Sequence, residues 1–265
     1  MNEFYGSQKT VSNDWLMDVV RGEASEEFFA IEFFAEDVQN GVEEILAEGS
    51  PQPFQTAPFT VQVVSNNAAD DIAGAGARRV RVQGLIEDGT GKRSLDFEDF
   101  DLVGNGTSVV GTKNFVRVFR TGVLESGTYG TGPTNLGNNV ADVVVETSGG
   151  VELLTMRAGQ GTGRTAVFQT PDGVQTVLRT IDTDVPGARA VTLKVWRRDN
   201  ADDTTAPVRP WRLVRENLEQ TGQIVSNIPI PISPSRVDLM ITAEGTGGAA
   251  SAARATLEFL FYPRE

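Results

Sequence analysis

From residue 59 onward, apolar and polar residues alternate in short runs, and this period of two restricts the chain to β-strands. The clearest runs are 59–64, 79–85, 114–119 and 190–196, all rich in β-branched and aromatic residues. Clusters of glycine, asparagine and aspartate separate the runs, so turns recur at intervals of roughly 8–12 residues. The pattern predicts an all-β fold of antiparallel β-sandwiches, jelly-roll-like and two in number.

Three segments are expected along the 265 residues. Residues 1–58 form an N-terminal arm, residues 59–158 the first sandwich and residues 159–265 the second. The glycine-rich stretch 158–163 marks the boundary between the sandwiches. One continuous double-sheet body is the alternative.

The N-terminal arm is expected to contain a short helix over residues 36–48. Apolar residues recur there at helical spacing, namely Val38, Val42, Ile45 and Leu46. Gly49 follows as a stop signal. Residues 24–34 fit either a buried strand or successive helical turns, and both interpretations stay open.

The chain contains no cysteine and no histidine. These absences exclude disulfides, thiolate metal sites, histidine-ligated metals and catalysis by Ser–His–Asp or Cys–His groups. A net charge of −13 disfavours nucleic-acid binding, which depends on neutralising phosphates. No secretory signal and no apolar run near 20 residues is visible, so no membrane association is expected. We expect a protein without enzymatic activity and without a cofactor.

Four carboxylates crowd into residues 95–102, at Asp96, Glu98, Asp99 and Asp101. The first interpretation is a charge-protected edge strand, with a bulge where the apolar phase changes between Phe97 and Phe100. Carboxylate oxygens also bind calcium, which gives a second interpretation. A glycosidase pair built on Asp96 and Glu98 is the third. No catalytic or metal-binding residue is assigned.

The protein is expected to work through contacts between subunits. The proline-rich run 228–234 carries alternating isoleucines, which pack either under the rim of a sandwich or against a neighbouring subunit. Aromatic and arginine side chains are typical anchors of protein interfaces. The expected contact residues are Trp15, Phe28, Phe33, Phe34, Arg197, Trp211, Ile230 and Ile232.

Residues 63–85 resemble a pattern found in virion structural proteins of marine tailed phages and related environmental viruses. In that pattern a Ser/Asn-Ala-Asp segment leads into Gly-x-Gly-Ala-Arg and then into an alternating strand ending in Gly-Leu. Further similar pieces follow in order, at residues 105–112, 115–118, 126–130, 135–137, 165–173 and 229–243. The resemblance covers residues 24–262, and its motifs are structural turns without a catalytic residue. The acidic, phenylalanine-rich stretch 26–34 departs from it, since similar proteins are more basic there.

The resemblance implies a capsid, decoration or fibre-type component of a virus particle. Such a protein is made in the host cytoplasm, resides in the virion and associates with copies of itself and with other virion proteins. The residues leave a second function open, a tail or fibre module that recognises a glycan on the host surface.

Overall fold

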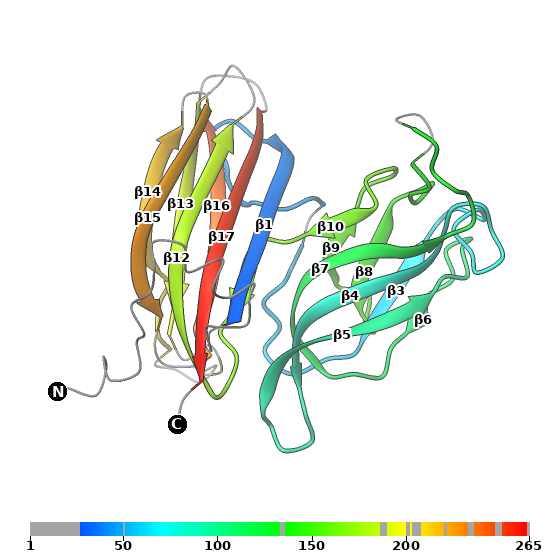
Figure 1. The fold of residues 1–265 in the computed structure, drawn as a ribbon, viewed down its shortest axis with the longest axis horizontal. Coiled ribbons are helices and arrows are strands. Elements are labelled where there is room, and N and C mark those ends of the chain that lie inside the picture. Colours follow the sequence, from blue (N-terminus) through cyan, green and yellow to red (C-terminus); the bar gives the residue numbers. More distant parts are fainter. Residues whose placement is uncertain are drawn as a thin grey trace.

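The computed structural model describes residues 27–49, 51–132, 136–185, 190–199, 202, 208–219, 222–232, 236–246 and 251–263. Within these residues the chain forms strands and no helix, and every strand pairing is antiparallel. The expectation of an all-β antiparallel fold is therefore confirmed. The described residues accordingly include no helix that could cross a membrane. Figure 1 shows two bodies of packed strands side by side.

The first body, here called the host sandwich, consists of the described residues within 27–46 and 166–263. One sheet has the order β1 (Glu27–Val38), β17 (Ser251–Pro263), β12 (Val174–Val185) and β15 (Gly222–Ile232). The other has β2 (Glu43–Ile45) and β11 (Val167–Gln169) beside β16 (Asp238–Thr246), then β13 (Ala190–Arg198) and β14 (Arg212–Glu219). The inward side chains of both sheets share one core, which includes Phe168, Leu178, Leu193, Ile241 and Phe259.

The second body, here called the inserted sandwich, lies within residues 47–165. Its first sheet has the order β10 (Thr162–Arg164), β7 (Phe115–Ser126), β4 (Ala77–Glu87) and β5 (Arg93–Asp101). Its second sheet has the order β6 (Val109–Val110), β3 (Val61–Ser65), β8 (Val143–Thr147) and β9 (Glu152–Met156). A separate core fills the space between these sheets, with Val63, Val82, Phe115, Val145 and Leu154 among its members.

The inserted sandwich interrupts a single edge strand of the host sandwich. Both β2 and β11 pair with the same strand, β16, and they do so end to end along it. The Leu46 N–H donates to the Ile241 carbonyl at 3.0 Å, and the Ile241 N–H donates to the Ala166 carbonyl, also at 3.0 Å. The chain thus leaves an edge strand after Leu46, builds a second sandwich, and resumes the same strand at Ala166.

The helix expected over residues 36–48 is wrong, because that region contributes the end of β1 and the whole of β2. Val38 and Leu46 are buried in the host core, whereas Val42 is exposed at the turn between the two strands. Of the two interpretations left open for residues 24–34, the strand is the one seen from Glu27 onward.

The described part of the expected arm also belongs to the chain's own fold, since β1 and β2 complete the two host sheets. The passage between the sandwiches lies after Arg164, where β10 ends, and before Val167, where β11 begins. The sequence boundary at residues 158 and 159 falls inside the inserted sandwich. Trp15 lies outside the described residues.

Candidate functional site

The acidic stretch of β5 forms ion pairs with the neighbouring strand β4. Arg81 binds Asp99 with a fork of two hydrogen bonds of 2.7 and 2.9 Å, and Arg79 binds Asp101 at 2.6 Å. The hydrogen bond from Arg81 lowers the pKa of Asp99 below its usual value. The register between β4 and β5 runs unbroken, so the expected bulge is absent.

The other two carboxylates of β5 bind the loop between β6 and β7 at the edge of the inserted sandwich. Glu98 accepts the backbone N–H groups of Thr112 and Lys113 at 2.7 and 3.2 Å, and Asp96 binds the Lys113 ammonium. Burial opposes ionisation of Asp96, but its hydrogen bonds to Lys113 and a backbone N–H outweigh this, so its pKa is lowered. Among the described residues, no group of three potential ligand side chains gathers to hold a metal ion. The geometry is that of a charge-protected edge.

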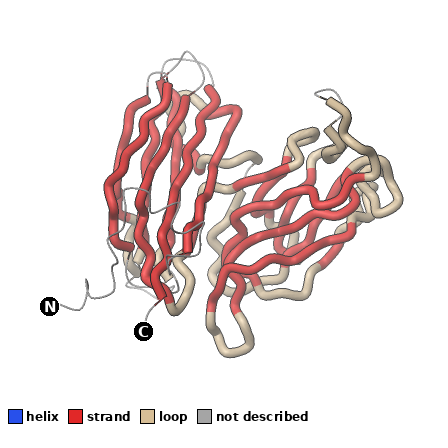
Figure 2. Tube along the Cα trace, viewed as in Figure 1, coloured by secondary structure: helices blue, strands red, loops and turns tan. Residues whose placement is uncertain are grey.

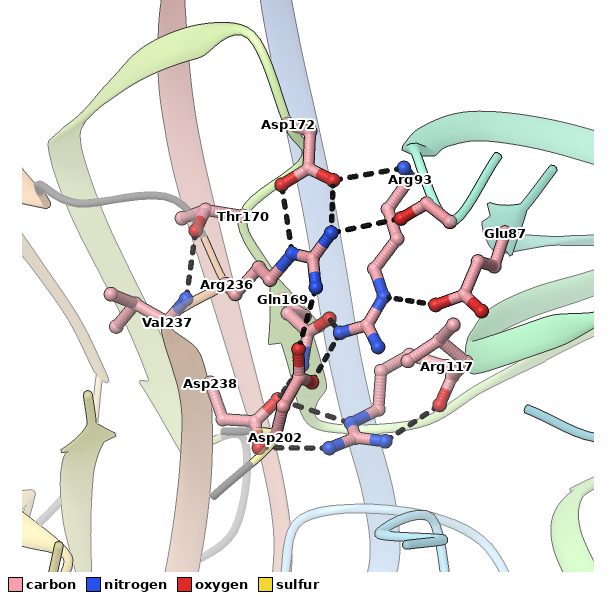
Figure 3. Close-up of polar contacts among 12 residues, drawn as sticks. Glu87, Arg93, Arg117, Gln169, Thr170, Asp172, Asp202, Arg236, Val237 and Asp238 are labelled. Atoms are coloured by element: carbon pink, nitrogen blue, oxygen red, sulfur yellow. Dashed lines mark hydrogen bonds and ion pairs between the residues drawn. The ribbon is translucent and has the colours of Figure 1, made fainter. Parts of the chain in front are cut away.

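Two deeply buried charged side chains lie where the two sandwiches meet (Figure 3). Arg117 of β7 and Asp238 of β16 form a bidentate pair with hydrogen bonds of 3.1 and 2.9 Å. Their side chains are only 2% and 0% exposed. Gln169 and Arg198 also donate to the Asp238 carboxylate, at 2.9 and 2.6 Å. One carboxylate of the host sandwich therefore holds an arginine of the inserted sandwich in a fixed orientation.

A second group of charges surrounds this pair. Arg93 of β5 binds Glu87 at 2.9 Å within its own sandwich, and it binds Gln169 of the host sandwich at 2.9 Å. From the host side, Arg236 holds Asp172 with hydrogen bonds of 3.0 and 2.8 Å. It also reaches the Gly91 carbonyl of the inserted sandwich at 2.8 Å. Figure 3 shows these side chains converging from both bodies.

Apolar contacts complete the junction. Phe119 of the inserted β7 packs against Phe168 of the host core, with ring centroids 5.4 Å apart. Phe54, in the segment between β2 and β3, packs edge-on against Trp211, which directly precedes β14, with ring centroids 5.1 Å apart. The Arg198 guanidinium lies 4.8 Å from the centroid of the Trp211 ring. Apolar packing and the bidentate Arg117–Asp238 pair together fix the inserted sandwich against the host sandwich.

The contact residues expected from the sequence lie as follows. Trp211 packs within the chain at the junction, Arg197 binds Asp199 at 2.6 Å, and Ile232 is buried in the host core. Of the two alternatives for the proline-rich run, Ile232 therefore fits packing under the rim of the host sandwich. The side chains of Phe28, Phe33, Phe34 and Ile230 lie outside the described part of the structure.

Sequence reasoning did not find the junction. Arg117 and Asp238 are 121 residues apart, and each occupies an ordinary strand sequence. The only signal available was an arginine inside the apolar run 115–119, which implies a buried partner because an unpaired buried charge is strongly unfavourable.

The junction also predicts how stability depends on pH. Burial opposes ionisation of Asp172, but the hydrogen bonds from Arg236 and the Arg93 N–H outweigh it, so its pKa lies below the usual 3.8. A lowered carboxyl pKa contributes stability above 3.8 that is lost as the pH falls through the folded-state value. The chain has no histidine or cysteine to titrate near neutrality.

We therefore expect the free energy of unfolding to be nearly constant between about pH 5 and 8 and to fall below about pH 4. Urea unfolding followed by tryptophan fluorescence across this range measures it. The variant Asp172→Asn, which removes this carboxyl, should show a shallower acid decline. A steep transition near pH 6.5 would contradict the expectation.

A buried carboxylate joins two loops at the end of the inserted sandwich that lies away from the host sandwich. Asp70 is fully buried and accepts four hydrogen bonds of 2.8 to 2.9 Å. One oxygen accepts the N–H groups of Ala77 and Val140, and the other accepts the Ala141 N–H and the Ser65 hydroxyl. Asp70 thereby ties its own loop to the loop that precedes β8.

We expect Asp70→Asn to lower the free energy of unfolding by about 2–4 kcal/mol. Each oxygen of Asp70 receives a backbone N–H, so in either orientation an amide NH2 would face a donor. Chemical denaturation measures the loss. The matched control is Asp71→Asn, because Asp71 accepts only an exposed bond from Ala73 and its replacement should change stability by less than about 0.5 kcal/mol. Equal effects of the two variants would refute the assignment.

Comparisons with known proteins give only distant likenesses. No family model and no curated protein matches the chain. Among solved structures, that of infectious bursal disease virus, Gt strain, is 12% identical, with 91% of this chain and 74% of that chain covered and a TM-score of 0.21. A Bacteroides thetaiotaomicron lipoprotein is 12% identical, with coverages of 92% and 91% and a TM-score of 0.21. The mavirus penton protein is 7% identical, with coverages of 90% and 100% and a TM-score of 0.16.

Proposed function

We propose that this chain is a non-enzymatic structural protein of a virus or phage particle, which acts through contacts with copies of itself and with other particle proteins. The observation that carries the proposal is the strand order of the host sandwich. With β2 and β11 counted as one strand, its eight strands run 1-8-3-6 in one sheet and 2-7-4-5 in the other. This order is that of the jelly roll, an architecture of viral capsid domains and also of lectins and cupins.

Two further features favour a particle protein among the uses of this fold. The resemblance of residues 63–85 to virion proteins of marine phages points to the particle, and those residues lie in the inserted sandwich. The buried Arg117–Asp238 ion pair and two further hydrogen bonds across the junction hold the two sandwiches in one relative orientation. A fixed subunit shape suits closed symmetric assembly, in which every copy must present the same surfaces in the same geometry.

Light scattering of the purified 28.5 kDa chain, over a range of protein and salt concentrations, tests the proposal. We expect a closed oligomer or a larger particle with a discrete mass. A monomer under all these conditions would count against self-assembly and would leave the binding-module function, tested on a glycan array, as the better explanation.

A further inference from the structure

The end of the inserted sandwich away from the host sandwich has an unusual composition. It comprises the described parts of four loops, residues 66–76, 102–107, 127–132 with 136–141, and 157–161, here called the loop end; Figure 2 shows loops gathered there. These loops contain only three charged residues, Asp70, Asp71 and Arg157, whereas 22% of the whole chain is charged. Asp70 is buried, and Arg157 pairs with Glu48 and Asp142. The loops themselves therefore contribute almost no unpaired charge.

Large apolar side chains are exposed on the same loops. Tyr129 is 88% exposed and Leu136 is 58% exposed. Ile72, Val103 and Val140 are also exposed. Depletion of charge together with exposed aromatic and aliphatic side chains is the composition of the centre of a protein–protein interface.

Hydrogen bonds also tie the described parts of these loops to one another. The Ile72 N–H donates to the Leu102 carbonyl at 2.8 Å, and the Gly127 N–H donates to the Gly76 carbonyl at 2.9 Å, so three of the loops are hydrogen-bonded to one another. Buried Asn139 joins the fourth by donating to the Arg157 carbonyl at 2.9 Å and accepting the Gly161 N–H at 3.0 Å. Loops ordered in advance lose little conformational entropy on binding.

The net charge of the chain restricts where two associating copies can meet. Two copies, each with a net charge of −13, repel one another over most of their surfaces. They can approach closely where the surface is neutral and apolar, which is the character of the loop end. We propose that the loop end is a contact surface between copies of this chain. This inference rests on the proposed function and names the surface through which assembly occurs.

Charge placed on the loop end of the full-length chain tests the proposal. We expect the wild-type chain to associate, and to associate more strongly as salt screens the repulsion between copies. Leu136→Glu and Tyr129→Glu should each weaken association about tenfold or more, because a carboxylate would be desolvated in the contact. Sedimentation velocity over a concentration series measures the change, and thermal melting checks that each variant is folded.

The matched control is Val110→Glu, which adds the same charge to the same sandwich. Val110 is 55% exposed but lies on β6, outside the loop end. The Val110→Glu variant should associate as strongly as the wild-type chain. Association of the Leu136 and Tyr129 variants at the wild-type level would overturn the loop-end contact and leave the proposed function standing. Equal weakening by Val110→Glu would overturn it too, because net charge alone would then explain the effect. A wild-type chain that stays monomeric would overturn both.

Discussion

A chain that lacks residues 47–166, with Leu46 joined directly to Val167, is expected to fold into a complete host sandwich. Ile45 pairs with Thr242 and Val167 pairs with Met240, so a single residue opposite Ile241 closes the interrupted strand. Leu46 supplies that residue. Its side chain is already buried in the host core, as is that of Phe168 two positions further along the new chain. The join therefore preserves the alternation of inward and outward side chains.

Circular dichroism and hydrogen exchange measure this outcome. We expect a β-sheet spectrum, one cooperative unfolding transition and protected amides in β12 and β17, the central strands of one host sheet. Stability should be lower than in the full chain, because the junction contacts of Phe119 and Arg117 are lost.

The control deletes one residue more and joins Leu46 to Phe168. A slip of one residue sends every following side chain of that strand to the opposite face, so Phe168 would leave the core. This variant should unfold at a much lower denaturant concentration or fail to fold. If the two deletions behave alike, β2 and β11 are not halves of one strand.

The second large effect is expected from Asp238→Asn at the junction. The substitution keeps the size of the side chain but leaves Arg117, only 2% exposed, without its carboxylate. Breaking a buried ion pair from one side costs about 3–5 kcal/mol of unfolding free energy, since the remaining charge is buried without compensation. Urea denaturation measures the loss.

Two comparisons separate this effect from a general effect of charge removal. Asp99→Asn breaks the partly exposed pair with Arg81, whose side chains are 31% and 33% exposed, and should cost no more than about 1 kcal/mol. Arg117→Met combined with Asp238→Asn removes both charges and should be more stable than Asp238→Asn alone. Equal losses from Asp238→Asn and Asp99→Asn would show that the junction pair does not fasten the two sandwiches.

Local pattern was enough to predict most of the strands. The period of two gave the all-β class. In the unbroken strand β5 it also puts Asp96 and Glu98 on one side and Asp99 and Asp101 on the other, and the two pairs have separate partners. The spacing of apolar residues gave a wrong prediction, a helix, between residues 36 and 48. Val38, Val42 and Leu46 recur every four residues, and an interval of four places side chains on one face of a helix and also on one face of a strand. Pairing with β17 and β16 decided in favour of strands.

By itself, the sequence determined the β-strand character of the chain from residue 59 onward, the absence of histidine and cysteine chemistry, and the low charge of the loops at 66–76, 102–107 and 127–141. Only the tertiary structure decided which strands are neighbours. It brought together β2 and β11, which are separated by a whole sandwich in the chain, and it paired Arg117 with Asp238. The physical reason is that side-chain alternation is a local property, whereas strand neighbours and buried charge pairs form between residues far apart in the sequence, where no local spacing records them.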